Sequence, residues 1–356
     1  MGAIRIGRRI IYALKKVVLL FKQNLMIKVT LLFVFIFIGT VNKAQGLIFD
    51  STEFSKREKI EETRTELPIS VSLKKYTPLL YPQVGSTCVA HSFSNARTIL
   101  LAKSLNWADI KKITSLSFSP YYIYYRNKEY GDVNCSSGLN IESTAKDILN
   151  NGFAPIVEVE YPHYYPFTDT ALCIEGKGSI YPPTLSEDMA YAKKFKIDEI
   201  YRVTSIMELK TALAAGMPVI LCMYSTSSFK KLKGDIWIPQ ITDKIDKNMG
   251  HSLIAIGYDE TKYGGAIELM NSWGDTWGNK GFVWVKYKDY IKWFLGGYAL
   301  YVDNSIKLKD ANNPEFKPKA AKIEKKIMKV NSYDGKSKIK FDNSEFIKAF
   351  QSPKNE

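Results

Sequence analysis

The chain has 356 residues, of which 46% are hydrophobic, so it can bury at least one large core. Its formal net charge is +14, but the excess lies at the two ends: residues 1–45 carry eight basic and no acidic residues, residues 304–356 carry thirteen lysines and seven acids, and residues 46–303 carry 29 of each. A nucleic-acid groove needs basic residues clustered on the folded domain. We therefore expect no nucleic-acid partner.

Residues 1–44 are typical of a signal-peptide region. A basic start at Lys28 precedes a mostly apolar run over 29–41, and the small residue Ala44 follows that run. A membrane-spanning helix needs about 20 apolar residues, more than this run provides. We expect an exported protein (secreted, periplasmic or at the cell surface) without a stable membrane anchor after cleavage, and Met26 is a candidate for the true start.

The next part of the chain predicts helices. Residues 45–75 are charged and poor in apolar residues, as in a short N-terminal segment or linker. From Cys88 to residue 101, apolar residues recur at helical spacing, and Ser86 and Thr87 are candidate caps. Further helices are expected over 117–125 and 141–150.

From residue 217 onward the pattern changes to strands. A continuous apolar run over 217–224 indicates a buried strand, and shorter strands are expected over 253–257, 266–270, 281–286 and 298–302. Helices followed by antiparallel strands favour an α+β fold. Residues 304–356 are rich in Lys, Asn, Pro and Ser, which predicts a disordered tail; a small strand pair near 327–341 is the alternative.

Three sequence blocks carry the chemistry. Asn271 opens the run NSWGDTWGNKGF, in which two tryptophans and three glycines stand at fixed spacing. His251 lies in the block GHSL, and Cys88 follows Gln83 in a segment of small residues. A cysteine nucleophile needs a neighbouring base, a group that orients the base, and a donor for the oxyanion. Gln, Cys, His and Asn supply this set in chain order.

With these blocks, the chain resembles the papain-like cysteine peptidases over about residues 76–303. Residues 134–138, NCSSG, resemble the Cys-Asn-Gly-Gly loop of that family. The resemblance implies a two-lobed fold, with a helical lobe over about 76–200, an antiparallel β-barrel-like lobe over about 201–303, and the active site in the cleft between them. It also implies hydrolysis of protein or peptide substrates without a cofactor or metal ion, and we expect a monomer.

The resemblance gives each residue of the set a role. Cys88 is the nucleophile, since a helix N-terminus and a neighbouring imidazolium lower a thiol pKa from its ordinary value of about 8.5. His251 is the base that later protonates the leaving amine, and Asn271 fixes its tautomer. Gln83 and the Cys88 backbone N–H form the oxyanion hole. Gln83 is five residues before Cys88, where relatives usually have six, so a tighter loop is expected.

The resemblance also assigns substrate-binding residues. Gly138 matches the glycine whose backbone pairs with an extended substrate, and Ser137 replaces the glycine before it. Trp273 covers the His251–Asn271 hydrogen bond from water. Cys222 and Ser252 fall where the family lines its main specificity pocket, although Cys222 is equally well explained as a buried strand residue.

Two other cysteines match family half-cystines whose usual partners are missing here. Gly85 stands where relatives carry the partner of Cys135, and the usual partner of Cys173 is also replaced. The resemblance therefore leaves a Cys135–Cys173 disulfide as the expectation in an exported protein, with two free loop thiols as the alternative.

Three functions fit these residues. The main expectation is a secreted cysteine peptidase, an endopeptidase that forms a thioester at Cys88. Acyl transfer to an amine on the same fold is the first alternative, and sequence does not separate it from hydrolysis. A non-catalytic peptide-binding module on a degenerate fold is the second, and the presence of all four residue types argues against it.

Overall fold

The computed structural model describes residues 46–62, 66–132, 135–155, 192–303, 329–331 and 338–340. The predicted signal-peptide region and most of the predicted tail lie outside these residues, as do Asn134 and Cys173. Within the described ranges, no helix combines the length and apolar character that a membrane crossing requires.

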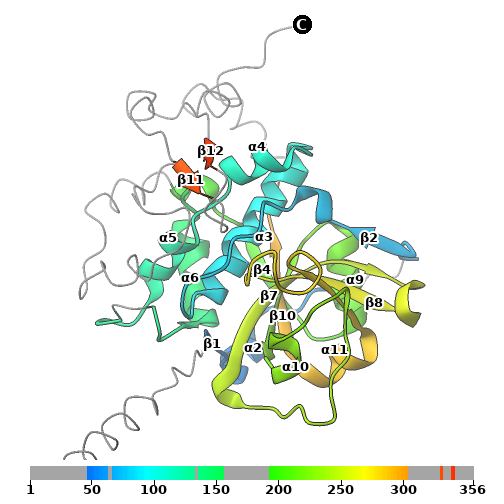
Figure 1. Ribbon diagram of the computed structural model, residues 1–356. Coiled ribbons are helices and arrows are strands. Elements are labelled where there is room, and N and C mark those ends of the chain that lie inside the picture. The colour runs from blue at the N-terminus through cyan, green and yellow to red at the C-terminus, as the bar shows by residue number, and fades with distance from the viewer. Residues whose placement is uncertain are drawn as a thin grey trace, which may run out of the picture. The chain divides into compact units, whose positions relative to one another are not determined.

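Helices make up the first half of the described fold (Figure 1). The long helix α3 (Cys88–Ser104) is its centre, and α4 (Ile110–Ser115), α5 (Pro120–Asn127) and α6 (Ile141–Asn151) follow. Local sequence sets the start of α5 in two ways: the Ser119 hydroxyl accepts from the N–H of Tyr122 at 3.1 Å, and Pro120 occupies the first turn. The helices predicted near 88, 117 and 141 are therefore present.

An eight-stranded sheet forms the second half. Its path runs through β4 (Glu199–Val203), β10 (Phe294–Tyr301), β5 (Val219–Tyr224), β7 (Gly250–Asp259), β8 (Ala266–Met270), β9 (Phe282–Lys286) and β6 (Ile236–Trp237), while β2 (Ser70–Ser72) pairs with β7. All pairings are antiparallel except β6 with β9. Helices followed by this sheet confirm the predicted α+β class, with β4 and β6 at the two ends of the strand order.

Shorter elements connect these parts. They are the helices α9 (Ile206–Ala214), α10 (Ser227–Lys230) and α11 (Tyr287–Trp293), the 3-10 turns η1 (Lys74–Tyr76), η2 (Lys193–Phe195), η3 (Lys247–Met249) and η4 (Lys262–Gly264), and a separate antiparallel pair, β11 (Lys329–Asn331) with β12 (Lys338–Lys340). The helix α3 packs against β5 and β7. This packing brings the first residue of α3 to the strand that carries His251.

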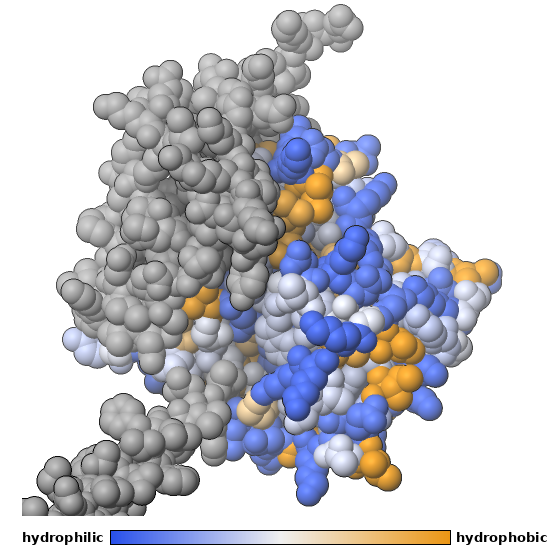
Figure 2. Space-filling model, viewed as in Figure 1, coloured by the Kyte–Doolittle hydropathy of each residue, from blue (hydrophilic) through white to orange (hydrophobic). Residues whose placement is uncertain are grey.

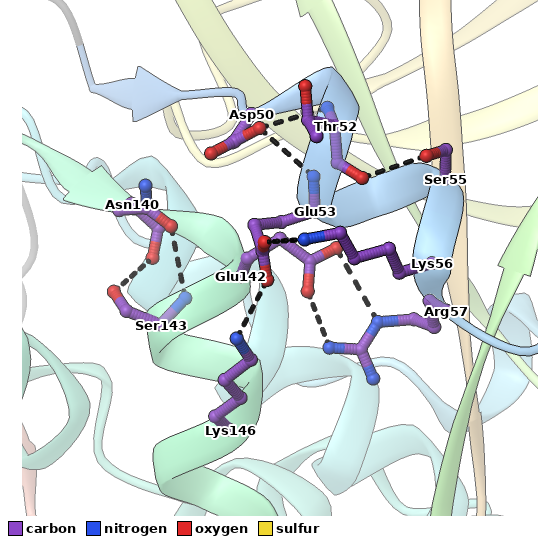
Figure 3. Close-up of polar contacts among 10 residues, drawn as sticks. All are labelled: Asp50, Thr52, Glu53, Ser55, Lys56, Arg57, Asn140, Glu142, Ser143 and Lys146. Atoms are coloured by element: carbon purple, nitrogen blue, oxygen red, sulfur yellow. Dashed lines mark hydrogen bonds and ion pairs between the residues drawn. The ribbon is translucent and has the colours of Figure 1, made fainter.

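Residues 46–60, which precede the helices and the sheet in the chain, pack onto them. The strand β1 (Leu47–Ile48) pairs in parallel with β3 (Leu139–Asn140), and α2 (Ser51–Lys56) follows it. Asp50 caps α2 by accepting from the N–H groups of Thr52 and Glu53 at 2.9 and 3.0 Å (Figure 3). The ring of Phe54 lies 5.2 Å from that of Tyr298 on β10.

After α2 the chain adds to the edge of β4. Arg202 donates its N–H to the carbonyl of Glu58 at 2.8 Å, and the N–H of Ile60 donates to the carbonyl of Arg202 at 3.1 Å. Two buried carboxylates of the domain find their cations here: Glu142 pairs with Arg57, and Glu208 pairs with Lys59, each at 2.6 Å (Figure 3 shows the first pair). Residues 46–60 are thus an integral part of the folded unit.

Replacing Arg57 with alanine should lower the free energy of unfolding by about 3–5 kcal/mol, because it leaves the buried Glu142 carboxylate without its partner. The matched control is Lys56→Ala on the same helix, whose pair with Glu53 is exposed to water, and it should change stability little (Figure 3). Urea unfolding of both variants checks this. Equal losses in the two variants would contradict the assignment.

Candidate active site

Cys88 begins α3 and lies against β7. Thr87 precedes it, but its hydroxyl donates to the carbonyl of Val84 at 2.8 Å and does not cap the helix. The predicted capping by this side chain is therefore wrong. Burial raises the pKa of the Cys88 thiol, and backbone hydrogen bonding from Ser252 of β7 and from Val89 acts in the opposite direction.

His251 and Asn271 come together from β7 and from the end of β8. His251 Nε2 lies 2.8 Å from Asn271 Oδ1, and the backbone N–H of Ser272 donates to the same oxygen at 2.8 Å. Because this oxygen is an acceptor, Nε2 carries the hydrogen, which leaves Nδ1 as the basic nitrogen of the ring. The asparagine therefore fixes the tautomer that a base beside Cys88 needs.

Trp273 lies against the imidazole of this pair. Its ring stacks on the imidazole of His251, with centroids 4.3 Å apart and planes 28° apart. Behind it, the rings of Phe229 and Trp277 pack at 5.8 and 5.5 Å. Excluding water lowers the local dielectric constant and strengthens the His251–Asn271 hydrogen bond.

Gln83 reaches the site through a tight loop. Its Nε2 donates to the carbonyl of Gly85 at 2.8 Å, and Gly85 adopts a left-handed φ of 59°. The Oε1 atom of Gln83 accepts from the hydroxyl of Ser272 at 2.6 Å, and the backbone N–H of Gln83 donates to the Ser272 carbonyl at 2.7 Å. Ser272 thus positions Gln83, a role that we did not predict although it stands beside Asn271 in the sequence.

The backbone next to Gly138, which we predicted to pair with substrate, pairs with the chain's own residues. Leu47 and Ile48 lie beside Leu139 and Asn140 in β3, immediately after Gly138 and Ser137. An extended segment does pair with this edge, but it is the protein's own residues 47–48.

Gly46 places the start of this segment directly over the sulfur of Cys88. Its carbonyl accepts from the N–H of Leu139 at 3.1 Å, and its N–H donates to the carbonyl of Gly250 at 3.2 Å. A Cβ atom at position 46 would collide with the sulfur of Cys88, so only glycine fits. Cys88 is consequently 1% exposed and His251 4% exposed.

Burial sets the protonation of Cys88 and His251, the pair that residues 46–48 cover. It raises the pKa of the Cys88 thiol to about 12 and lowers the pKa of His251 to about 4. The covered form therefore holds a neutral thiol and a neutral imidazole at neutral pH. The thiolate expected from the sequence is therefore not the favoured state of Cys88 in this covered form.

The remaining predicted residues lie near the site or outside the described ranges. Cys222 and Ser252 are paired across β5 and β7 and fully buried, and neither lines the open cavity, so their pocket role stays a prediction. Cys88 and Cys222 are free thiols, whereas Cys173, the predicted partner of Cys135, lies outside the described residues. His91 is buried on α3, with its Nδ1 3.1 Å from the Thr87 carbonyl.

A cavity of about 470 Å³ opens beside the covered pair. Cys88, His251, Gln83 and Trp273 all contribute to its wall. The cavity also contains residues that we did not predict, namely Gly46, Ser225, Thr276 and the lysines Lys230, Lys231 and Lys233. Three residues of the predicted catalytic set, Gln83, Cys88 and His251, thus line one cavity, and Asn271 joins them through its hydrogen bond to His251.

Comparisons with known proteins identify the class to which this fold and site belong. The sequence model of the papain family of cysteine proteases matches residues 108–294. The chain is 27% identical over 173 residues to cysteine proteinase 1 of Entamoeba histolytica and 26% identical over 175 residues to a cathepsin L-like proteinase of Fasciola hepatica. Each match covers 48% of this chain, and the chain spans about half the length of these relatives (48% and 46%).

Solved structures agree in fold. Xylellain, a cysteine protease from Xylella fastidiosa, superimposes with a TM-score of 0.56 and 23% identity over 74% of this chain and 97% of its own. ProCathepsin B S9 from Trypanosoma congolense gives a TM-score of 0.55 and 15% identity over 74% and 88% of the two chains. The chain belongs to the papain family of cysteine proteases.

Proposed function

We propose that this chain is an exported cysteine endopeptidase in which Cys88 attacks the substrate carbonyl and His251 transfers the proton. The observation that supports this most strongly is the 2.8 Å contact between His251 Nε2 and Asn271 Oδ1, in a wall shared with Cys88. That contact leaves Nδ1 for the thiol. Neither a degenerate binding module nor a packing role for the imidazole requires this tautomer.

The reaction would proceed in two halves. The sulfur of Cys88 attacks the carbonyl carbon, a C–S bond forms, and the carbonyl electron pair moves to an oxyanion held by the Cys88 backbone N–H and the Gln83 amide. The C–N bond then breaks as the His251 imidazolium gives its proton to the leaving amine. Water, deprotonated by His251, hydrolyses the thioester and returns the thiol.

The described form would be a resting state of this enzyme. Turnover requires residues 46–48 to leave the cleft, after which water and substrate reach Cys88 and an ion pair with His251 becomes favourable. Proton transfer from sulfur to imidazole within the pair involves no net uptake of protons. We also propose that the Cys135–Cys173 disulfide forms after export, which peptide mapping without reduction tests.

The proposal is tested by an epoxide reagent directed at papain-type thiols, applied together with a quenched fluorescent protein substrate. We expect substrate cleavage, stoichiometric loss of activity, and a label that mass spectrometry places on Cys88 and not on Cys222, the second free thiol among the described residues. Adding a primary amine as acceptor separates transfer from hydrolysis. If neither the label nor any cleavage is found even when residues 46–48 are displaced by Leu47→Glu, the chain is a binding module.

A further inference from the structure

We propose that this enzyme selects substrates that carry a carboxylate on the leaving-group side of the cleaved bond, and that Lys230, Lys231 and Lys233 bind it. The catalytic part of this statement rests on the proposed function. The binding part rests on the cavity itself.

One wall of the cavity is strongly basic. Lys230 ends α10, Lys231 and Lys233 follow it, and all three line the same cavity as His251 and Trp273. Among the described residues of that wall there is no acidic side chain. Hydrophilic side chains gather on the face of the molecule that carries α10 (Figure 2). Such a concentration of one sign of charge in a cleft attracts ligands of the opposite sign.

The basic wall is held rigidly against the catalytic residues. Phe229, between the lysines and the core, packs its ring 5.0 Å from Trp237 and 5.8 Å from Trp273, which stacks on His251. The Trp277 indole N–H donates to the Phe229 carbonyl at 2.8 Å, and the N–H of Gly278 donates to the Leu232 carbonyl at 3.1 Å. The backbone that carries the lysines therefore keeps a fixed place relative to the imidazole.

Proximity to His251 puts this wall on the leaving-group side. His251 would protonate the leaving nitrogen, so the part of the substrate beyond that nitrogen lies against the neighbours of His251. The charge of Lys230 reaches the imidazole: after burial, which is the larger cause, it also lowers the pKa of His251. The opposite side of the cleft, along β3, is occupied by Leu47 and Ile48.

The three lysines differ in how free they are. Lys230 interacts with the charge of Asp246, and Lys233 donates to the carbonyl of Thr276 at 2.5 Å. Lys231 is exposed, and within the described residues its ammonium group makes no hydrogen bond or ion pair that would have to break when it binds a carboxylate. Lys231 is therefore the best single position at which to reverse the charge.

The carboxylate has two possible sources, an acidic side chain within a longer substrate or the substrate's own C-terminus. Four peptides with one acyl sequence separate them: Glu, Gln or Lys at the second leaving-group position with an amidated C-terminus, and Gln with a free C-terminus. Each exposed lysine–carboxylate contact is worth a few-fold, so three together predict a preference of about tenfold in kcat/KM for the acidic partner. The ratio between peptides does not depend on the fraction of molecules that are open.

The variants are Lys231→Glu and the triple change of Lys230, Lys231 and Lys233 to Gln, with Lys111→Glu on the distant helix α4 as the matched control. We expect the acidic preference to disappear in the triple variant, to reverse in Lys231→Glu, and to persist in the control. Should the triple variant fail to fold, Lys231→Glu decides. Preference for the Glu peptide identifies an internal side chain; preference for the free C-terminus identifies terminal recognition.

A second readout needs no peptidase activity. Alkylation of Cys88 by anionic iodoacetate and by neutral iodoacetamide is followed by mass spectrometry, and the ratio of the two rates should fall several-fold in Lys231→Glu but not in Lys111→Glu. If no peptide is cleaved, the proposed function fails and this ratio still decides the binding question. Equal cleavage of the Glu, Gln and Lys peptides, or an alkylation ratio that Lys231→Glu leaves unchanged, would overturn the proposal.

Discussion

Cys88→Ala should reduce turnover of a protein substrate by about 10⁴-fold or more, because the thioester can no longer form. His251→Gln should cause a loss of comparable size, since nucleophile and base act as one unit and their effects do not add. Initial rates with a quenched fluorescent protein measure both variants, and circular dichroism shows that each has folded.

The matched control for this prediction is His91, the other buried histidine among the described residues. His91 lies one turn after Cys88, and burial lowers its pKa to about 4, as it does for His251. It does not line the cavity, and its Nδ1 lies 3.1 Å from the Thr87 carbonyl. His91→Gln should therefore keep turnover within a few-fold. Substantial hydrolysis by Cys88→Ala, or equal losses for the two histidine variants, would contradict the assignment of the pair.

Leu47→Glu should increase the labelling rate of Cys88 by about 100-fold or more. Leu47 is 1% exposed in the covered form, and burying an unpaired carboxylate there costs several kcal/mol, while each 1.4 kcal/mol shifts the closed-to-open equilibrium tenfold. Because the penalty applies only while residues 46–48 occupy the cleft, it favours the open form. The measurement is the rate of modification at Cys88, read by mass spectrometry.

The control for the cleft-opening variant is Ile69→Glu. It makes the same kind of change at an isoleucine that is 68% exposed, away from residues 46–48, and should leave the labelling rate unchanged. If Leu47→Glu labels no faster than Ile69→Glu, residues 46–48 do not limit access to the thiol.

The sequence predicts the catalytic set because local patterns define each member. The apolar run after Cys88 indicates a helix, and the strands that contain His251 and precede Asn271 are buried and adjacent in the sequence. Pairing of β7 with β8 then brings the imidazole and the amide together. His251 and Asn271 are only twenty residues apart in the sequence, so the pairing of two neighbouring strands is enough to bring His251 Nε2 to 2.8 Å from Asn271 Oδ1.

The covered cleft could not be predicted in the same way. Gly46 reaches Cys88 only after the chain has folded through β3 and β7, and the stretch 45–75 is mainly charged, which hides its apolar start. The one sequence feature that could have indicated a buried segment here is the apolar stretch Gly-Leu-Ile-Phe at residues 46–49. Nothing in the sequence indicated the ion pairs made by Arg57 and Lys59. Their partners Glu142 and Glu208 are distant in the chain, and the burial of these two carboxylates is known only from the fold.

The basic wall also depends on tertiary packing. Lys230, Lys231 and Lys233 look like a solvated turn in the sequence, and only the contacts of Phe229 with Trp273 and Trp277 place them at the cavity. A charge run gains a binding role when an aromatic anchor fixes it beside a reactive group.

The most direct measurement is the pH dependence of Cys88 alkylation by iodoacetamide in the Leu47→Glu protein, with and without His251→Gln. An activated sulfur predicts a fast reaction that persists to a pH well below the ordinary thiol pKa of about 8.5, and a return to that value or above when the imidazole is removed. A single ionisation near 8.5 in both proteins would show that His251 does not activate Cys88.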